Sequence, residues 1–578
     1  MRSFLYYSNI RLLVLVLHGG MAAGLCEAQT RVRDYEWLPL EKRASFGKIP
    51  PNWTFADSVT IHPEKPNQVK IVPGSRILVG KPGEPIFPSL NGRNFKLYLS
   101  YSLSPGASAT ISLPGGGFVL VSEGRGADGE KMSGFTGLAP FQDVGKTAGL
   151  LQTMEVDYES DIPGLRDKAR INEVRINGIV VQQAQYLAHL PSSPAIGIRV
   201  DNGTAVFSAI GFQKSENRRP VLVSDLTYKL YNDEWDSRTT DKLASSGTSP
   251  ELTFEVAGDR SSYNLVYEGN LVVKENGDYN FTTLYTGAYC QLSIDGNVVL
   301  DTDRSTSRET HQTNVRIEAG THKIRLWYSK LPWAQAALGL KVGKTGIRDY
   351  DLHALSSLPE PSARPFLSAG PGAQRPEMVR SFIRFPGESH KRTHCLSVGS
   401  PLQRNFSVDL NRAALLQVWS GAFANTTEMW YGRGEAQLLT PLGTAESISG
   451  RSSFARLPNA DAPWVDSSAV NLLGYRIDSH GYPVIRYALG PSVIEDAITA
   501  TGKSINRTVT PERNASSGNY ILLAEGTQII PVEKGLYRVD GRYYVKMGSP
   551  APPTLRRSKG KTELLLQLAQ PVSYSIIW

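Results

Sequence analysis

The chain has 578 residues, of which 40% are hydrophobic, 20% charged and 9% aromatic, and its formal net charge is +8. These values are typical of a soluble globular protein with several cores, and they exclude a disordered chain, a coiled coil and a multi-span membrane protein. Only 3 cysteines and 9 histidines occur, which argues against a disulfide scaffold and against a multi-ligand metal protein.

Residues 1–28 have the pattern of an export signal. Two arginines flank the start of an apolar run at 12–17, and small residues two positions apart precede a cleavage point after Ala28. The run is too short to span a bilayer, which takes about 20 residues. A lipid anchor on Cys26 is disfavoured because the preceding Leu25 is not small. We therefore expect an exported chain without a membrane span, located in the periplasm, at the cell surface or outside the cell.

The remaining sequence alternates in short apolar runs. Phe95–Tyr101 and Thr153–Tyr158 have period two, and turn signals such as Asn177-Gly178 follow at short intervals. This pattern is typical of antiparallel sandwiches. A Pro-rich stretch at 351–374 predicts an extended linker. The sequence thus predicts an all-β fold of three β-sandwich or jelly-roll modules in series, at 29–214, 215–350 and 375–578.

The first module carries a Gly-x-x-Gln strand within 148–158, followed by the Asn177-Gly178 hairpin and a strand at 205–210. In this order and spacing, residues 29–213 resemble the concanavalin A-like family of 3-keto-disaccharide hydrolases. The resemblance implies a jelly roll whose carboxylates cleave oxidised disaccharides.

One strand of that family carries Glu, Gln and Asp, and this chain has Val119, Val121 and Gly124 at the equivalent positions. Glu123 is displaced by one residue, which on a strand turns its side chain to the other face. Glycosidic cleavage normally needs two positioned carboxylates. We therefore expect that this module keeps the fold and has lost the chemistry.

A second carboxylate row occurs at Glu155, Asp157, Glu159 and Asp161. Alternate residues of a strand share a face, so the row could form an acid/base or metal-binding set. Alternation of this kind also marks the solvated face of an outer strand, which is the interpretation we favour. If the module is an enzyme, the catalytic candidates are Glu123, Glu155 and Asp157.

The second module contains Gly277-Asp278-Tyr279-Asn280-Phe281, then Asp295-Gly296, then Ala319-Gly320-Thr321-His322. Together these motifs resemble the β-sandwich module named after anthrax protective antigen. Sugar-binding members hold calcium with adjacent loop aspartates, whereas Asp301 and Asp303 are not adjacent here. We therefore expect no calcium, and we interpret the lone His322 as a turn residue.

The third module has its densest apolar stretch at 415–423, a predicted hairpin around His480-Gly481 and a last strand at 572–578. With these stretches it resembles a domain found beside c-type haem and sugar-dehydrogenase domains in exported bacterial proteins. The haem motif Cys-x-x-Cys-His is absent, so we expect no haem. His390, His394 and Cys395 lack a fourth ligand, so we expect no zinc. Four side chains could form a sugar platform, although large aromatics usually belong to a core: Trp419, Trp430, Tyr431 and Arg433.

The basic run at 556–561 is expected to be a solvated turn between strands, and nothing in the charge pattern indicates nucleic acid binding. The sequence as a whole favours an exported carbohydrate-binding or accessory protein without metal or cofactor. Its expected partners are carbohydrate and other envelope or surface proteins. Two alternatives stay open: hydrolysis of a 3-keto-glycoside by the first module, and a purely structural surface or assembly subunit.

Overall fold

The computed structural model describes residues 35–578, except for 42, 115, 122–133, 136–143, 161, 163–167, 188–195, 233–238, 287–288, 303–310, 359–366, 373, 432–436, 466–469 and 513–517. The expected signal segment, 1–28, lies outside these residues. Within them, the helical elements are η1 (Arg43–Ser45), η2 (Glu255–Ala257), α3 (Thr427–Tyr431) and η4 (Leu355–Ser357). The predicted all-β fold is therefore confirmed. No helix of the described part is both long and apolar enough to cross a membrane.

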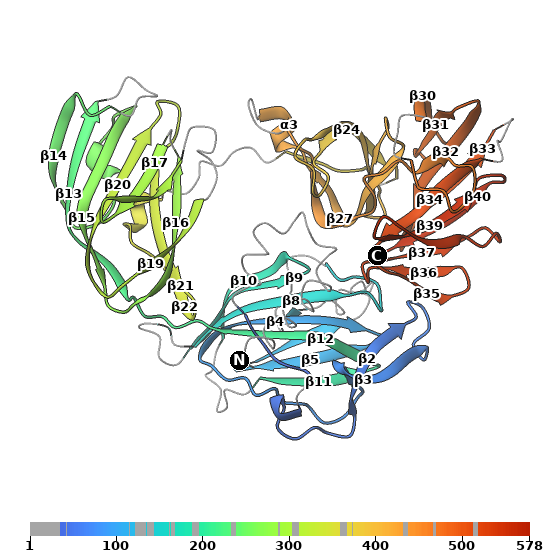
Figure 1. Cartoon of the computed structure of the whole chain (residues 1–578), viewed down its shortest axis with the longest axis horizontal. Helices are drawn as coiled ribbons and strands as arrows, with labels where there is room; N and C mark the ends of the chain where they lie inside the picture. Colours follow the sequence, from blue (N-terminus) through green and yellow to red (C-terminus); the bar gives the residue numbers. More distant parts are fainter. Residues whose placement is uncertain are drawn as a thin grey trace, which may run out of the picture. The chain divides into compact units, whose positions relative to one another are not determined.

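The chain divides into two compact units. The first unit combines Met1–Phe212 with Pro365–Trp578, and the second consists of Gln213–Arg364. The first and third stretches of strands therefore belong to one unit, and the second is inserted between them in the sequence (Figure 1).

The first stretch forms a large and a small sheet. The large sheet has the order β10-β9-β8-β4-β12-β3-β2, with β1 paired to β12. Its strands are β1 (Glu36–Trp37), β2 (Trp53–Ile61), β3 (Val69–Gly80), β4 (Asn94–Leu103), β8 (Gln152–Glu159), β9 (Ala169–Ile176), β10 (Ile179–Leu187) and β12 (Ala205–Lys214). The small sheet, β11-β5-β6-β7, contains β5 (Ser108–Leu113), β6 (Gly116–Val121), β7 (Gly134–Phe135) and β11 (Gly197–Asn202).

The alternation of the sequence explains how these two sheets pack. Met154, Val156 and Tyr158 of β8 are buried in one core together with Phe118 and Leu120 of β6. The β9–β10 hairpin closes at Asn177-Gly178, whose φ angles of 51° and 79° suit a two-residue turn.

The second unit also forms two sheets. One has the order β14-β13-β15-β20-β17-β18, with β13 (Val221–Asn232), β14 (Leu243–Ser249), β15 (Tyr263–Val273), β17 (Tyr289–Ile294), β18 (Asn297–Asp301) and β20 (Gly320–Lys330). The other, β19-β16-β21-β22, has β16 (Gly277–Thr286), β19 (His311–Ile317), β21 (Ala337–Lys344) and β22 (Ile347–Asp351). Tyr279 and Phe281 of the Gly-x-Tyr-x-Phe motif are both buried in the core between them. Leu352, within the stretch expected to be a linker, is buried in the same core.

The third stretch forms three sheets in the described residues. The first, β23-β27-β26-β25-β24 with β28 on β27, has β23 (Ser368–Ala369), β24 (Glu377–Ile383), β25 (Arg392–Gly399), β26 (Arg404–Asp409), β27 (Ala414–Asn425) and β28 (Thr440–Ser447). The second, β29-β34-β39-β38, has β29 (Phe454–Arg456), β34 (Asn519–Gly526), β38 (Thr554–Ser558) and β39 (Lys561–Gln567). The third, β30-β31-β32-β33-β40-β37-β36-β35, has β30 (Val470–Ile477), β31 (Pro483–Leu489), β32 (Ser492–Ala500), β33 (Ser504–Pro511), β35 (Ile529–Glu533), β36 (Leu536–Val539), β37 (Tyr543–Met547) and β40 (Val572–Ile577).

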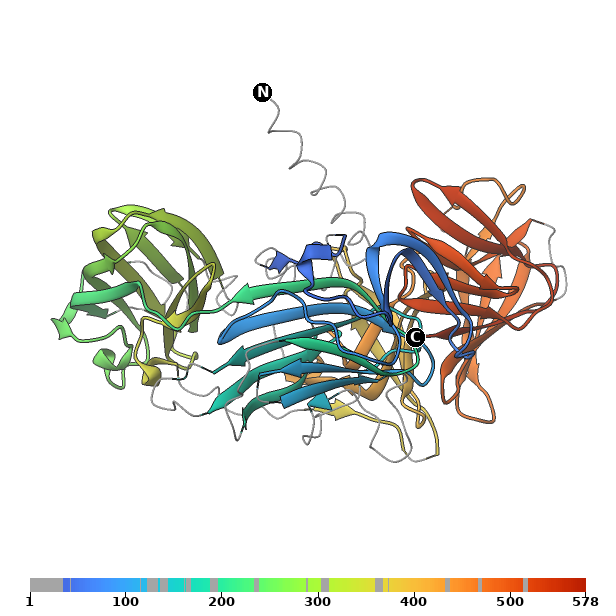
Figure 2. The ribbon, with the colours of Figure 1, turned by 90° about the horizontal axis from the view of Figure 1, so that it is seen from below.

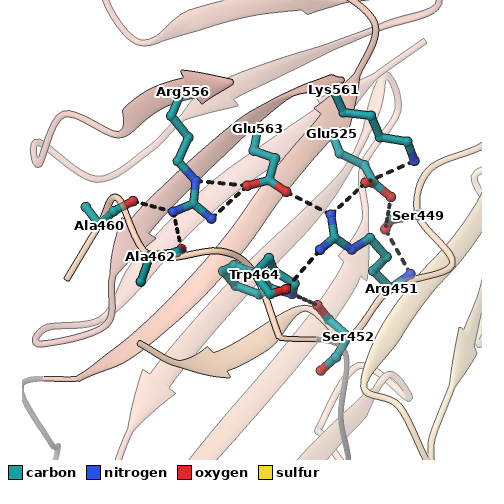
Figure 3. A network of polar contacts seen from close by, with 10 residues as sticks. All are labelled: Ser449, Arg451, Ser452, Ala460, Ala462, Trp464, Glu525, Arg556, Lys561 and Glu563. Atoms are coloured by element: carbon teal, nitrogen blue, oxygen red, sulfur yellow. Dashed lines mark hydrogen bonds and ion pairs between the residues drawn. The ribbon is translucent and has the colours of Figure 1, made fainter. Parts of the chain in front are cut away.

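A network of buried charges ties the loop before β29 to strands β34 and β39 (Figure 3). Arg451 Nη1 donates to Glu525 Oε2 at 3.2 Å and to Glu563 Oε1 at 2.8 Å. Arg556 Nε donates to the other oxygen of Glu563 at 2.9 Å, and Lys561 Nζ reaches Glu525 at 3.2 Å. The expectation of a solvated basic turn is therefore wrong for Arg556, whose side chain is 8% exposed beside a buried carboxylate.

The first and third stretches share both apolar and charged contacts. Leu150, from the first, is fully buried in the main core of the third. Four residues earlier, the Lys146 ammonium forms an ion pair with Glu446, and Arg542 Nε lies 3.1 Å from the same buried carboxylate. Burial of such a triad makes the two stretches interdependent, because removing one partner leaves an uncompensated charge.

The β2–β3 hairpin adds a second set of contacts. Glu64 and Lys65 lie in its loop, and they pair with Lys546 at 2.8 Å and with Glu533 at 2.5 Å. Figure 2 shows this hairpin, in blue, beside red strands of the third stretch.

Candidate functional site

The strongest candidate site in the first unit is the outer face of strand β8. Glu155, Asp157 and Glu159 alternate with buried apolar residues and therefore share this face. β8 lies between β9 and β4, so it is an interior strand and not the outer strand that we expected. Glu155 and Asp157 are half-buried and Glu159 is buried, which differs from a fully solvated face.

A β-bulge in β9 brings a polar side chain to this row. In the β8–β9 register Asp157 pairs with Glu173 and Tyr158 with Ile171, so Asn172 is the extra residue. Its amide nitrogen donates to Asp157 Oδ1 at 3.1 Å and to Glu159 Oε2 at 3.3 Å.

Arg170, also on β9, fixes the end of the row. Its Nη2 donates to Glu159 Oε2 at 2.8 Å, and only 3% of the Glu159 side chain is exposed. Arg170 and Asn172 therefore both donate to the same oxygen of Glu159, which fixes the position of this carboxylate.

Aromatic side chains border the other end. Tyr98 of β4 pairs directly with Glu155, and burial together with that carboxylate raises the pKa of its hydroxyl. Trp37 meets Tyr98 edge to face with ring centroids 5.3 Å apart, and Tyr35 lies 5.8 Å from each ring. Trp37 pairs with Gly211 on β12. A Cβ atom added to Gly211 would lie 3.0 Å from the indole ring of Trp37.

The face thus combines carboxylates, an amide, a guanidinium and aromatic rings. Carboxylates accept hydrogen bonds from hydroxyls, and the amide can donate and accept. Tyr35 and Tyr98 are buried, so of the three rings only the half-buried Trp37 offers a face on which apolar C–H groups could stack. Neighbouring carboxylates in the row have Cβ atoms about 6.6 Å apart, from the rise of a strand. The chemistry of this set suits a polyhydroxylated ligand.

The described positions that are equivalent to the family's carboxylates lie in another sheet. Glu123 lies outside the described residues. Val119 belongs to β6, which is in the small sheet and therefore in the opposite layer from β8. The row on β8 and the apolar strand are consequently not parts of one surface.

Of the four residues that could form a sugar platform in the third module, Trp419 belongs to the core, which is the interpretation we favoured. Trp419 is fully buried, with its Nε1 donating to the Phe423 carbonyl at 2.7 Å, so its ring cannot reach a surface ligand. Trp430, on α3, is 76% exposed. The Tyr431 side chain and Arg433 lie outside the described residues.

The histidines and cysteines have ordinary structural roles where they are described. His322, which we expected to be a turn residue, lies within strand β20, and its Nδ1 is 2.6 Å from Oδ2 of Asp295 in the β17–β18 turn. His394 and Cys395 are consecutive on β25 and so point to opposite faces. Burial raises the pKa of the Cys395 thiol to about 12. Within the described ranges no three His, Cys, Asp or Glu side chains are grouped as a metal site requires.

Comparisons with known proteins support no functional assignment. No protein-family model matches the sequence, and no curated protein matches it. Among solved structures, a protein named as a glycosyl hydrolase from Parabacteroides distasonis is 16% identical over 31% of this chain and 98% of its own, with a TM-score of 0.22. A beta-glucosidase from Kluyveromyces marxianus in complex with glucose is 17% identical over 21% of this chain and 16% of its own, with a TM-score of 0.17. An anti-sigma factor domain-containing protein from Clostridium clariflavum is 14% identical over 49% of this chain and 85% of its own, with a TM-score of 0.21. These are partial likenesses of β-folds.

Proposed function

We propose that this chain is an exported carbohydrate-binding or accessory protein, and that the outer face of β8 is its binding surface. The observation that carries the proposal is the Asn172 bulge, which holds Asp157 and Glu159 side by side. A preorganised row of acceptors lowers the ordering cost of capturing vicinal hydroxyls.

Binding is favoured over hydrolysis because of how the carboxylates are held. A general acid must carry a proton at working pH. Arg170 and Asn172 both donate to Glu159 Oε2, so this oxygen already accepts two hydrogen bonds within the protein and is not open to a leaving group. The resemblance of the first module to 3-keto-disaccharide hydrolases then implies a shared fold with a degenerate active site.

Hydrolysis of a 3-keto-glycoside is the second candidate. Glu155 and Asp157 share a face with Cβ atoms about 6.6 Å apart, which is compatible with the roughly 5 to 9.5 Å between the carboxyl groups of glycosidases. In this scheme Glu155, beside the buried Tyr98, would be the proton donor.

A glycan array probed with the full chain tests the first proposal. We expect Asp157→Asn and Asn172→Ala each to lower the affinity for any sugar bound at this face by about tenfold. This is the size of the effect expected when one hydrogen bond to a charged group is lost. The matched control is Asp201→Asn on β11, an aspartate of the small sheet paired with Arg199 at 2.7 Å. Equal binding by all variants would overturn the proposal.

A 3-keto-disaccharide incubated with the full chain tests the second candidate. Release of reducing sugar that Glu155→Gln abolishes would establish hydrolysis. Absence of both turnover and array binding would leave the structural surface subunit as the remaining function.

Export has its own test. The apolar run at 12–17 and the small residues before Gln29 support it. N-terminal sequencing of the protein recovered outside the cytoplasm should begin at Gln29, and an intact Met1 would contradict export by this route.

A further inference from the structure

The second unit has a polar cavity of about 590 Å³ on the outer face of its larger sheet. Four cross-strand neighbours form its main row: Thr227 on β13, Glu268 on β15, Arg325 on β20 and Ser293 on β17. Residues paired in this way have Cβ atoms about 5 Å apart. The row therefore presents alternating acceptors and donors across four strands.

A strained residue supplies a second row. β13 has a bulge between Ser224 and Thr227, and within it Asp225 has a φ of 52°, in the left-handed region that few non-glycine residues adopt. The bulge turns the Asp225 carboxylate toward Asn270, whose amide nitrogen donates to it at 2.7 Å. Strain of this kind is stored where the surrounding structure requires it, commonly at binding sites.

The second row continues across β15 to β20. Asn270 Oδ1 accepts a hydrogen bond from Lys323 Nζ at 2.8 Å, so Asn270 links the carboxylate to the ammonium. In the main row Arg325 Nε lies 3.5 Å from Glu268 Oε1. Each row therefore pairs one acid with one base.

This balance of charge selects the class of ligand. Among the residues that line the cavity, the carboxylates of Asp225 and Glu268 balance the cations of Lys323 and Arg325. An anion would therefore gain little net attraction, and an apolar ligand would leave these groups desolvated without partners. A neutral polyol offers each group a hydroxyl that donates or accepts as required. The volume lies within the range of roughly 300 to 1,000 Å³ that is usual for small-molecule sites.

We propose that this cavity is a metal-independent binding site for a neutral saccharide. It lies in the inserted unit and shares no residue with the β8 face, so it stands whether or not that face binds sugar. If both sites are active, the chain is bivalent, and linked sites raise avidity without new contacts.

The test is an array of neutral and acidic oligosaccharides, probed with the full chain in the presence of EDTA. We expect the double variant Glu268→Gln/Lys323→Gln to weaken binding of neutral sugars by about tenfold or more. The matched control is Asp278→Asn/Lys341→Gln, which makes the same charge change on the smaller sheet of the unit. The control and Asp157→Asn should retain this binding, which separates it from the β8 proposal.

Hydrogen exchange provides a second readout that does not depend on a variant. A neutral sugar found on the array should slow exchange in peptides covering β15 and β20 of the wild-type chain. The proposal is overturned if the double variant binds neutral sugars as tightly as the wild-type chain does. It is also overturned if EDTA abolishes the binding of neutral sugars, or if only acidic sugars bind. A hit without protection of β15 and β20 would also overturn it.

Discussion

The hydroxyl of Tyr544 donates a hydrogen bond to the carbonyl oxygen of Ala148 at 3.0 Å, although the two residues are 396 positions apart. The same hydroxyl lies 3.3 Å from the carbonyl oxygen of Ile61. Tyr544 therefore joins two segments of the first stretch to strand β37 of the third. Because the contact is buried, its groups must find partners there or remain unpaired.

Gly149 should tolerate no side chain at this contact. Its φ is +77°, and an added Cβ would meet the Tyr544 hydroxyl and lie 2.9 Å from the Ile61 carbonyl oxygen. Gly149→Ala should lose about 1–2 kcal/mol from the left-handed backbone and about 1–3 kcal/mol more from overpacking. The free energy of unfolding in urea measures both. Gly106→Ala is the control, since Gly106 has a φ of +69° and open space around its Cβ position. Equal losses in the two variants would show that the collision is absent.

Lys146→Met should destabilise the first unit by about 3 kcal/mol, since it removes one partner of a buried charge. Burial raises the pKa of Glu446, but Lys146 and Arg542 lower it further, so the net shift is downward. The stability from Glu446 is therefore present above its usual pKa of 4.5 and is lost as the pH falls through the lowered value.

In Lys146→Met the pKa of Glu446 should rise toward its usual value, so the stability that is lost on acidification should be smaller than in the wild-type chain. Urea midpoints measured across the acid range test this prediction. Lys48→Met is the control, because its pair with Glu84 is solvent-exposed and should contribute about 0–1 kcal/mol. The prediction fails if the two variants have the same acid profile.

Arg451→Met should loosen the loop that precedes β29, because it leaves Glu525 and Glu563 without their shared guanidinium. We expect a loss of about 3–5 kcal/mol in the free energy of unfolding. The rate of hydrogen exchange in the backbone amides of residues 449–464 should also increase more than the rate in the rest of the chain. Arg316→Met, which removes an exposed partner of Asp278, should change neither quantity appreciably. Unchanged exchange in Arg451→Met would mean that the network does not hold the loop.

His322 should titrate above its usual value, because the Asp295 carboxylate and the Glu318 carbonyl raise the pKa of its imidazole. The stability from His322 is then complete below its usual pKa of 6.5 and is lost as the pH rises through the raised value. Asp295 has a lowered pKa, so its contribution is lost only as the pH falls below the usual 3.8. NMR titration of the imidazole measures the shift, and Asp295→Asn should lower the midpoint. A midpoint unaffected by Asp295→Asn would rule out the pair.

The β8 row illustrates how much of the site the sequence could predict. The alternation of apolar and charged residues predicted that Glu155 and Asp157 share one face of a strand, and the structure confirms this. Asn172 and Arg170 could not be found in this way, because their role depends on a bulge that shifts β9 by one residue against β8. Trp37 was missed since its strand pairs with β12, far along the chain, and local periodicity carries no such information.

Turn chemistry was predictable where one dipeptide determines it. Asp295-Gly296 closes the β17–β18 hairpin with φ angles of 50° and 80°. The basic run at 556–561 was misjudged because charge alone indicates solvation, whereas Glu563 on the neighbouring strand provides Arg556 with a buried partner. Trp419 is buried, in agreement with the core interpretation that the general preference of large aromatics for a core favoured.

The division of the chain imposes an order on its folding. Gln213–Arg364 is continuous in the sequence and can collapse as soon as it is synthesised. The stretch that precedes it carries Leu150, whose burial requires strands near the C-terminus. The residues of the first stretch are synthesised first, but they gain these partners only after the third stretch has been synthesised. A chain truncated before the third stretch would leave Leu150 and the β2–β3 hairpin without these partners.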